Sequence, residues 1–326
     1  MPKRKQTVTR PDGIYVPATL QEAVIYFADP DNAFQWAVAR RWPDGVRCSF
    51  CESPNHSFIP TRKLWRCKAC KKQFSVRVGT IFEDSPISLG KWYMTMWMLM
   101  NCKNGVSSYE IHRAIGVTQK TAWFMLHRIR AAVKAKSFSK KLAGIVETDE
   151  CFIGGLFKNM HEKKREEIRA ANTPHKRGGI GKTIVQAVLE RGGEVRAQVI
   201  NDLTLDTRLD FLQENAEPGA KLMSDEGSDS PQVDAVFEHE FVNHQVEYVR
   251  GDVHCNGVEN FWALLQRTLS GTYVSVEPYH LGAYVDEQTF RFNERSDDDS
   301  GRFLTASAMV PTARLTYKEL IGAEQA

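Results

Sequence analysis

The residues of this 326-residue chain with the clearest capacity for chemistry are three carboxylates in its second half. Asp149 closes one strand-like run, Asp225 follows another, and Glu259 opens a predicted helix. Carboxylates at strand ends and at a helix start can converge on one point, where their oxygens are suitable ligands for Mg²⁺. Two such ions about 4 Å apart would activate a nucleophilic oxygen and stabilise the leaving oxygen in a phosphodiester displacement.

Other acidic residues lie close to these three, and spacing alone does not exclude them. Glu147 shares a strand face with Asp149 by the period of two, and the further acidic neighbours are Glu150, Glu226 and Asp252. Glu259 lies opposite the apolar stripe of its predicted helix. The alternative that Glu259 is an ordinary solvated glutamate therefore stays open.

A second group with metal-ligand spacing lies in the first half of the chain. Cys48, Cys51, Cys67 and Cys70 form two CxxC pairs separated by 15 residues, the spacing expected of a Cys₄ zinc ribbon. Two disulfides are the alternative, which a reducing cytosol disfavours, and His56 is a less favoured ligand. We predict one structural Zn²⁺ that the ribbon needs in order to fold.

Basic and aromatic residues alternate around the second cysteine pair, between Arg62 and Phe74. This rim is a natural phosphate-contacting surface. Its candidate DNA-binding residues are Lys68, Lys71 and Lys72.

The segment 107–130 predicts a helix-turn-helix, with the turn at Gly116 and the second helix capped by Thr118. Three polar side chains of the second helix would then be exposed and available to DNA: Gln119, Lys120 and Arg128. A helical pair with glycine in its turn is also a common structural motif, so a purely structural role is the alternative.

The net charge of +3 is divided unevenly along the chain. Residues 1–143 hold 24 Lys/Arg against 9 Asp/Glu, a net +15, and residues 144–326 hold 19 against 31, a net −12. This asymmetry favours a basic part that meets a polyanion and an acidic part with another task. Chance solvated charge is the alternative.

Composition and hydropathy limit the class of protein. With 42% apolar and 25% charged residues, neither a disordered chain nor a small disulfide-held module is expected. The basic N-terminus is not followed by an apolar stretch, and the longest apolar run, Trp92–Met100, is too short to span a bilayer. We therefore expect a cytoplasmic protein with no membrane partner.

The elements that must position the candidate residues follow from periodicity and turn signals. One or two helices are expected over 18–41, with Asp31 as a plausible N-cap, and more helices over 88–135. After Ala143 strands dominate, including a hairpin at Gly192-Gly193. A helix over 207–215, a strand over 220–224 and a long helix from about Val258 follow, and the tail after Ser296 is expected to be peripheral.

Several segments of this sequence resemble a known family. They are Arg41–Cys48 before the ribbon, Val146–Gly155 around Asp149, Leu222–Gly227 around Asp225, and the specific stretch His254–Arg267 with Gly271–Tyr273 and Tyr284–Arg295. Together these segments resemble the ISXO-like bacterial insertion-sequence transposases, which have an N-terminal zinc ribbon and a DDE catalytic domain.

The resemblance implies a multidomain α+β and α/β protein. Its parts would be N-terminal helices and zinc ribbon over 1–80, a helix-turn-helix region over 81–140, an RNase H-like, integrase-type catalytic domain over 141–296, and a C-terminal tail over 297–326. Residues 156–182 would form a basic insertion in the catalytic domain, and its positive charge would help a net-negative domain approach DNA.

The resemblance carries the catalytic triad onto Asp149, Asp225 and Glu259, which would hold two Mg²⁺ or Mn²⁺ ions. It also marks His254 and Asn256 as active-site neighbours. Family members often place a basic residue further along the same helix; Gln266 and Arg267 occupy that region here, and Arg267 is preferred because Gln266 carries no charge.

The implied activity is metal-dependent cleavage and strand transfer at the terminal repeats of an insertion sequence. The partners would be double-stranded DNA, both transposon ends and target, and further copies of the chain, since two ends must be held together. Such a bacterial protein would be nucleoid-associated when bound to DNA. The alternatives are a domesticated, non-catalytic DNA-binding regulator and, less favoured, a plain RNase H-type nuclease.

Overall fold

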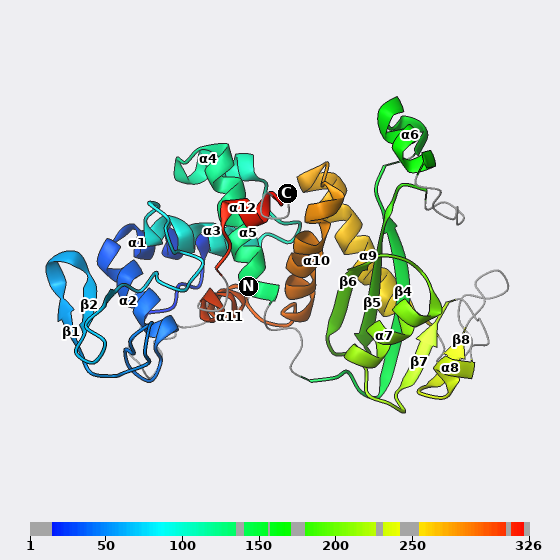
Figure 1. Cartoon of the computed structure of the whole chain (residues 1–326), viewed down its shortest axis with the longest axis horizontal. Coiled ribbons are helices and arrows are strands. Elements are labelled where there is room, and N and C mark those ends of the chain that lie inside the picture. Colours follow the sequence, from blue (N-terminus) through cyan, green and yellow to red (C-terminus); the bar gives the residue numbers. More distant parts are fainter. Residues whose placement is uncertain are drawn as a thin grey trace, which may run out of the picture. The chain divides into compact units, whose positions relative to one another are not determined.

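The structure, a computed structural model, describes residues 15–134, 140–155, 157–170, 180–225, 231–241, 254–310 and 314–322. The chain divides into two compact units (Figure 1). The first comprises Met1–Lys136 together with Glu294–Ala326, and the second comprises Ser137–Asn293. In the described part of the chain, no helix has the length and apolar character needed to cross a membrane.

The first unit is mainly helical. Its helices are α1 Leu20–Ala28, α2 Pro30–Arg41, α3 Leu89–Asn101, α4 Ser108–Ile115, α5 Gln119–Lys134, α11 Asp299–Ala308 and α12 Tyr317–Leu320. The ring of Phe303, which is fully buried, lies 5.3 Å from Trp36 and 5.0 Å from Trp97. Helices α2, α3 and α11 therefore share one aromatic core.

The expectation of a peripheral tail after Ser296 is wrong. Phe303 and Ala306 are both 0% exposed, and they lie on one face of α11 because they are three residues apart. The acidic run Asp297–Asp299 suggested a solvated end of the chain, but it stands at the start of this buried helix, where Asp298 caps α11 by accepting from the Gly301 backbone N–H.

The predicted helical stretch over 18–41 divides at Asp29. The Asp29 side chain accepts a hydrogen bond of 2.7 Å from the Asp31 backbone N–H, and Pro30 occupies the first helical position of α2. The N-cap of α2 is therefore Asp29 and not Asp31, because a proline whose φ is already helical starts the helix one residue after the aspartate.

The cysteine-rich segment folds into three short antiparallel strands, β1 His56–Ile59, β2 Leu64–Cys67 and β3 Gln73–Phe74, with a 3-10 turn at Pro60–Arg62. Trp65 and Phe74 face each other across β2 and β3 and stack at 5.8 Å. These two buried rings are the largest apolar groups of this small sheet.

The predicted helix-turn-helix geometry is confirmed. Ser107 and Glu110 form a reciprocal capping box at the start of α4. Gly116 ends that helix with φ of 62°, a left-handed conformation that favours glycine. The Thr118 hydroxyl then accepts from the Thr121 N–H at 3.1 Å and begins α5.

The second unit is built on a five-stranded sheet. Its strands are β4 Ile145–Ile153, β5 Thr183–Glu190, β6 Val195–Ile200, β7 Lys221–Ser224 and β8 Glu238–Phe241, in the order β6-β5-β4-β7-β8. The hairpin predicted at Gly192 joins β5 to β6. Strand β5 is antiparallel to both of its neighbours, β6 and β4, whereas β7 and β8 continue the sheet parallel to β4.

Helices cover both faces of this sheet (Figure 1). They are α7 Leu205–Asn215, α8 Pro231–Asp234, α9 Asn256–Thr268 and α10 Pro278–Asn293, with a π-helical turn at Leu269–Tyr273 after α9. Helix α6, Glu162–Ala170, lies beyond the ends of the strands and covers neither face (Figure 1). Residues of α9 and α10 share a core with one face of β4, β5 and β6, and α7 shares a core with the other face. The predicted mixed α/β fold class is confirmed.

The predicted insertion 156–182 is described in part. A 3-10 turn, Phe157–Asn159, and α6 lie in it, and residues 171–179 and Leu156 lie outside the described residues. None of the described residues of α6 is buried, which agrees with a surface insertion.

Candidate functional site

The four predicted cysteine ligands are brought together. The Sγ atoms of Cys48, Cys51, Cys67 and Cys70 all lie within 4.8 Å of one another, with Cys48 and Cys70 at 3.7 Å and Cys51 and Cys67 at 3.6 Å. A tetrahedral ion with Zn–S bonds of about 2.3 Å would separate its sulfurs by about 3.8 Å. The cluster therefore fits a structural zinc.

Backbone donors further prepare this cluster for a metal. The Cys70 N–H points at the Cys67 sulfur at 3.5 Å, and the Phe50 N–H points at the Cys48 sulfur at the same distance. The backbone N–H of Cys70, and after it that of Ala69, lower the pKa of Cys67 to about 6. His56 is not a ligand, because its Nε2 lies 3.0 Å from the Val46 carbonyl oxygen.

The lysines predicted at the rim of the ribbon are all exposed. They are Lys68, Lys71 and Lys72. The Lys72 ammonium lies 4.8 Å from the centre of the Phe50 ring, and Phe50 is itself 48% exposed. This corner of the ribbon thus offers cationic and aromatic groups side by side.

The three polar residues predicted on α5 have different environments. Lys120 is exposed, with its ammonium 4.7 Å from the Tyr317 ring, and Gln119 is half-buried and donates to the Ser108 hydroxyl at 2.9 Å. The prediction that Arg128 is exposed is wrong. It is 5% exposed, because it lies on the inner face of α5.

The Arg128 guanidinium has a structural role within the first unit. It donates to the carbonyls of Leu315, Ile81 and Glu83 at 2.7–2.8 Å. The charge is buried because three backbone oxygens satisfy it. The C-terminal segment is thereby held against α5.

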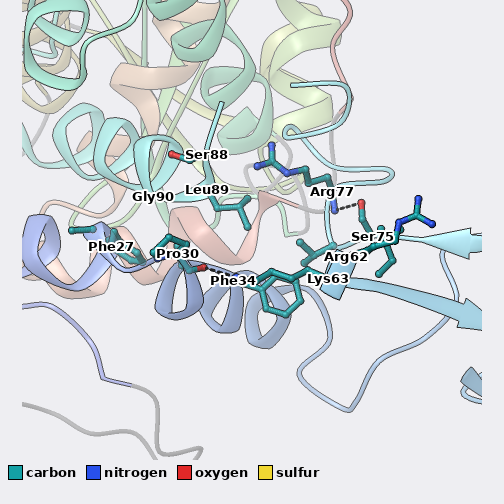
Figure 2. Close-up of a pocket in the computed structure, with 14 residues that line it drawn as sticks. Phe27, Pro30, Phe34, Arg62, Lys63, Ser75, Arg77, Ser88, Leu89 and Gly90 are labelled. Carbon is teal, nitrogen blue, oxygen red and sulfur yellow. Dashed lines mark hydrogen bonds between the residues drawn. The ribbon is translucent and has the colours of Figure 1, made fainter. Parts of the chain in front are cut away.

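A hollow of about 410 Å³ lies between the α1–α2 junction, the ribbon and the start of α3 (Figure 2). Arg62, Lys63 and Arg77 line it. Lys63 already pairs with Asp31 at 2.5 Å, and Arg77 donates to the Ser85 carbonyl at 2.9 Å. Lys63 and Arg77 therefore already have partners within the first unit. The Lys63–Asp31 ion pair joins the ribbon to helix α2.

Asp149 and Asp225 are brought level by the sheet. Strand β4 pairs in parallel with β7, with Ile145 opposite Lys221 and Glu147 opposite Met223. Two residues further along this register, Asp149 is level with Asp225 across neighbouring strands, whose spacing is about 4.8 Å. Residues 76 positions apart in the chain therefore meet where β7 ends. Asp149 does not close its strand as predicted, because β4 continues to Ile153.

The environment of Asp149 disfavours its charged form. Burial, followed by the nearby charge of Asp225, raises the pKa of Asp149 to about 7. Its Oδ1 accepts the Glu150 N–H at 2.7 Å, and its Oδ2 accepts the Trp262 indole N–H at 2.8 Å. Both carboxylate oxygens are thus oriented, and a divalent cation would relieve the repulsion between the two aspartates.

This raised pKa predicts a pH-dependent stability. Between about pH 4 and pH 7 the folded protein holds a proton on Asp149 that the unfolded chain has released, so the free energy of unfolding falls as pH rises. This proton on Asp149 accounts for a loss of roughly 4 kcal/mol in the free energy of unfolding over that pH range.

Urea unfolding without added divalent cations, at steps between pH 4.5 and pH 8, measures this dependence of the free energy of unfolding on pH. In Asp149→Asn the slope should be shallower; an unchanged slope would contradict the assignment.

Glu147 holds the helix that carries the third carboxylate. It is 1% exposed and accepts the N–H groups of Gly257 and Val258 at 2.7 and 3.1 Å, at the start of α9. Arg191 donates to its other oxygen at 2.8 Å and also to the His254 carbonyl. Glu147 therefore caps α9 and ties its first turn to β4.

Of the remaining acidic neighbours, the structure describes only Glu150. Glu150 lies on the opposite side of β4 from Asp149, 3.7 Å from Arg208 of α7. Glu226 and Asp252 lie outside the described residues.

The other predicted active-site residues lie on or beside α9. Glu259 is exposed in its first turn and Arg267 is exposed in its last. Asn256 is exposed at its first position, and His254 is half-buried, with Nδ1 3.5 Å from Oε1 of Glu147. Burial, then the charge of Glu147, and after these the charges of Asp225, Asp149 and Glu259 raise the pKa of the buried Cys255 thiol, which precedes α9.

The carboxylates are grouped less tightly than the cysteines. In the described part of the chain, the cysteine cluster is the one set of acidic, histidine or cysteine ligands whose atoms all lie within 4.8 Å of one another. The carboxylate oxygens of Asp149, Asp225 and Glu259 are therefore not all within 4.8 Å of one another.

Two contacts at this site were not predicted from the sequence, which offered Gln266 only as an alternative to Arg267. Trp262 donates to Asp149, and Gln266 donates to the Cys151 sulfur at 3.2 Å. The signal for both was their spacing of four residues along α9, which places them on the face toward β4.

The approach of α9 to β4 explains Gly257. A Cβ atom there would lie 2.7 Å from Oε2 of Glu147 and 2.9 Å from Cδ2 of Leu189. We expect Gly257→Ala to lower the free energy of unfolding by about 1–3 kcal/mol and to displace Glu259. Gly282→Ala is the matched control, because nothing lies within 4 Å of the added methyl group; it should stabilise α10 by up to about 1 kcal/mol. Equal denaturation midpoints for the two variants would contradict the close packing.

Segments of both units match known protein families. Residues 141–293 match the ISXO2-like transposase domain, and residues 29–73 match the transposase zinc-ribbon domain. A protein of Halobacterium salinarum described as an uncharacterized protein in transposable element ISH50 is 26% identical over 239 residues, 71% of this chain and 80% of that protein. The two domain matches, which together cover well over half of the chain, carry the conclusion. The chain belongs to the ISXO2-like insertion-sequence transposases with an N-terminal zinc ribbon.

Proposed function

We propose that this transposase cleaves DNA at the terminal repeats of an insertion sequence and transfers the freed strand to target DNA. The observation that carries the proposal is the level placement of Asp149 and Asp225 on neighbouring strands, with a pKa of about 7 for Asp149. Burial, and then the charge of Asp225, raise this pKa, and a buried pair of acidic groups of this kind is typical of a functional site.

The residues fit hard divalent cations. Each Asp149 oxygen accepts one hydrogen bond and retains a lone pair for a metal, and Asp225 and Glu259 supply further carboxylate oxygens of the kind that Mg²⁺ or Mn²⁺ prefers. Two such ions would make water or a 3′-hydroxyl a better nucleophile and stabilise the leaving oxygen. The chain's own part is to hold the carboxylates and the DNA in place.

In the proposed reaction, water attacks the phosphorus at the end of the element and releases a 3′-hydroxyl. That hydroxyl then attacks a phosphodiester of the target and displaces a second 3′-oxygen. Asp149, Asp225 and Glu259 would hold the metal, and His254 and Asn256 would border the reacting phosphate. Arg267, exposed in the last turn of α9, is proposed to contact DNA phosphate.

The first unit is proposed to bind the ends of the element. Lys68, Lys71 and Lys72 would contact phosphates, and Lys120 and Gln119 of α5 would reach base edges. Arg128 is no longer a candidate, because it is buried. Because two ends take part in one reaction, we propose that the active form on DNA contains at least two copies of the chain.

Cleavage of a labelled duplex that carries the element's end tests this function. With Mg²⁺ or Mn²⁺ we expect a nick at the element's boundary that leaves a 3′-hydroxyl, and with Ca²⁺ we expect binding without cleavage. Binding without nicking under every divalent cation would instead favour a DNA-binding regulator. Nicking of unrelated sequences at the same rate would favour a plain nuclease.

A further inference from the structure

Helix α9 and strand β4 are joined by side-chain contacts at a matched spacing. Glu147, Asp149 and Cys151 are alternate residues on one face of β4. They bind, in turn, the Gly257 N–H at 2.7 Å, the Trp262 indole at 2.8 Å and the Gln266 amide at 3.2 Å. We call these three contacts the β4–α9 ladder.

The three contacts stay aligned because the strand and the helix rise by nearly the same distance from one contact to the next. Two residues of strand rise by about 6.8 Å, and four or five residues of helix rise by about 6.0–7.5 Å. The strand and the helix can therefore run alongside each other and keep every contact aligned. The middle contact is the one that touches a proposed metal ligand.

Packing holds the Trp262 side chain, which makes the middle contact of the β4–α9 ladder, in place. Its side chain is 6% exposed, and its ring lies 5.1 Å from Phe261, within the core that α9 shares with the sheet. Its indole has one polar atom, and that atom donates to Oδ2 of Asp149. Because Oδ1 accepts the Glu150 N–H, this N–H and the indole together fix the rotation of the carboxylate about its Cβ–Cγ bond, and the indole is the one contact that comes from α9.

Trp262 also relates Asp149 to the third carboxylate. Glu259 stands three residues before Trp262, so both lie toward the same side of α9. Movement of the indole would change the separation of Asp149 and Glu259 as well as the angle of Asp149.

We propose that Trp262 is a positioning residue of the metal site, which sets the orientation of Asp149 and its distance from Glu259. This inference rests on the proposed function. It states that the indole N–H, and not only the ring's packing, determines how tightly the carboxylates bind a divalent cation.

Trp262→Phe tests this role, because phenylalanine keeps most of the ring and removes the N–H. Partners that orient metal ligands are commonly worth about 10–100-fold in metal affinity. We therefore expect Mn²⁺ to bind the zinc-loaded variant about 10-fold more weakly or worse, by calorimetric titration of the full chain. The Mn²⁺ concentration for half-maximal cleavage should rise by a similar factor.

Thr268→Val is the matched control. It removes a buried side-chain hydrogen bond of the same helix, from Thr268 to Gln288 at 3.2 Å, at a place remote from Asp149 in the helix. We expect its Mn²⁺ affinity to equal that of the wild type. If Trp262 only packs, both variants should lower the melting temperature and leave Mn²⁺ affinity unchanged, which would overturn the proposal.

A third titration separates this proposal from the proposed function. Asp149→Asn should lose the Mn²⁺ site that the wild type has. If wild type and Asp149→Asn bind Mn²⁺ alike, the metal assignment itself fails and this inference fails with it. If Asp149→Asn loses the site but Trp262→Phe binds as the wild type does, only the role of Trp262 is refuted.

Discussion

Asp149→Asn and Asp225→Asn are each expected to abolish metal-dependent cleavage of the element's ends while leaving binding of those ends intact. Even the partners of metal ligands are worth about 10–100-fold in affinity or activity, so loss of a ligand should reduce the cleavage rate by more than ~100-fold. End binding is assigned to the first unit, which neither substitution touches. The readouts are nicking of a labelled duplex and a gel-shift titration in Ca²⁺.

Glu150→Gln is the control for this experiment. Glu150 is the next residue on β4 but lies on the opposite side, near Arg208, so it should retain cleavage within a few fold. A general loss of activity in all three variants would indicate a damaged strand and not a lost ligand. Cleavage at the normal rate by Asp149→Asn would refute the catalytic assignment.

Removal of the zinc is expected to unfold the ribbon and to abolish recognition of the ends. The ribbon's strands are two to four residues long, and Trp65 and Phe74 are its main buried rings. So small a core does not offset the entropy of folding, whereas structural zinc supplies an apparent binding free energy of about 10–16 kcal/mol. Cys67→Ser should therefore lose both zinc and specific end binding.

Cys102→Ser is the control for the zinc prediction. Cys102 is an exposed cysteine of the same unit and lies outside the cluster. Metal analysis should give one zinc per chain for the wild type and for Cys102→Ser, and far less for Cys67→Ser. Specific end binding by a zinc-free chain would show that the ribbon is dispensable for recognition.

The parts of the fold that could be predicted from sequence depend on local patterns. The CxxC spacing places four sulfurs at one ion without any knowledge of the rest of the chain. In the same way, glycine at 116 and at 192 marks turns because the backbone adopts φ of 62° and 74° there, which glycine tolerates best. Local geometry alone decides these features.

The parts that could not be predicted depend on partners that are distant in sequence. Arg128 is polar and lies on a basic helix, which suggests exposure, but its three carbonyl partners include Leu315, 187 residues away. Glu147 and Asp149 have the same residue class and the same strand face, yet one caps α9 and the other faces Asp225. Periodicity identifies a face and does not identify what packs against it.

The return of the chain after Asn293 to complete the first unit has a consequence for the order of synthesis. The aromatic core of α2 and α3 lacks Phe303 until α11 has left the ribosome, about 170 residues after α5, on the order of 10 s or longer at usual translation rates. The whole second unit is therefore synthesised before the first unit can close. A chain that terminates early contains the second unit but leaves the apolar surfaces around Trp36 and Trp97 uncovered, so incomplete products are expected to aggregate.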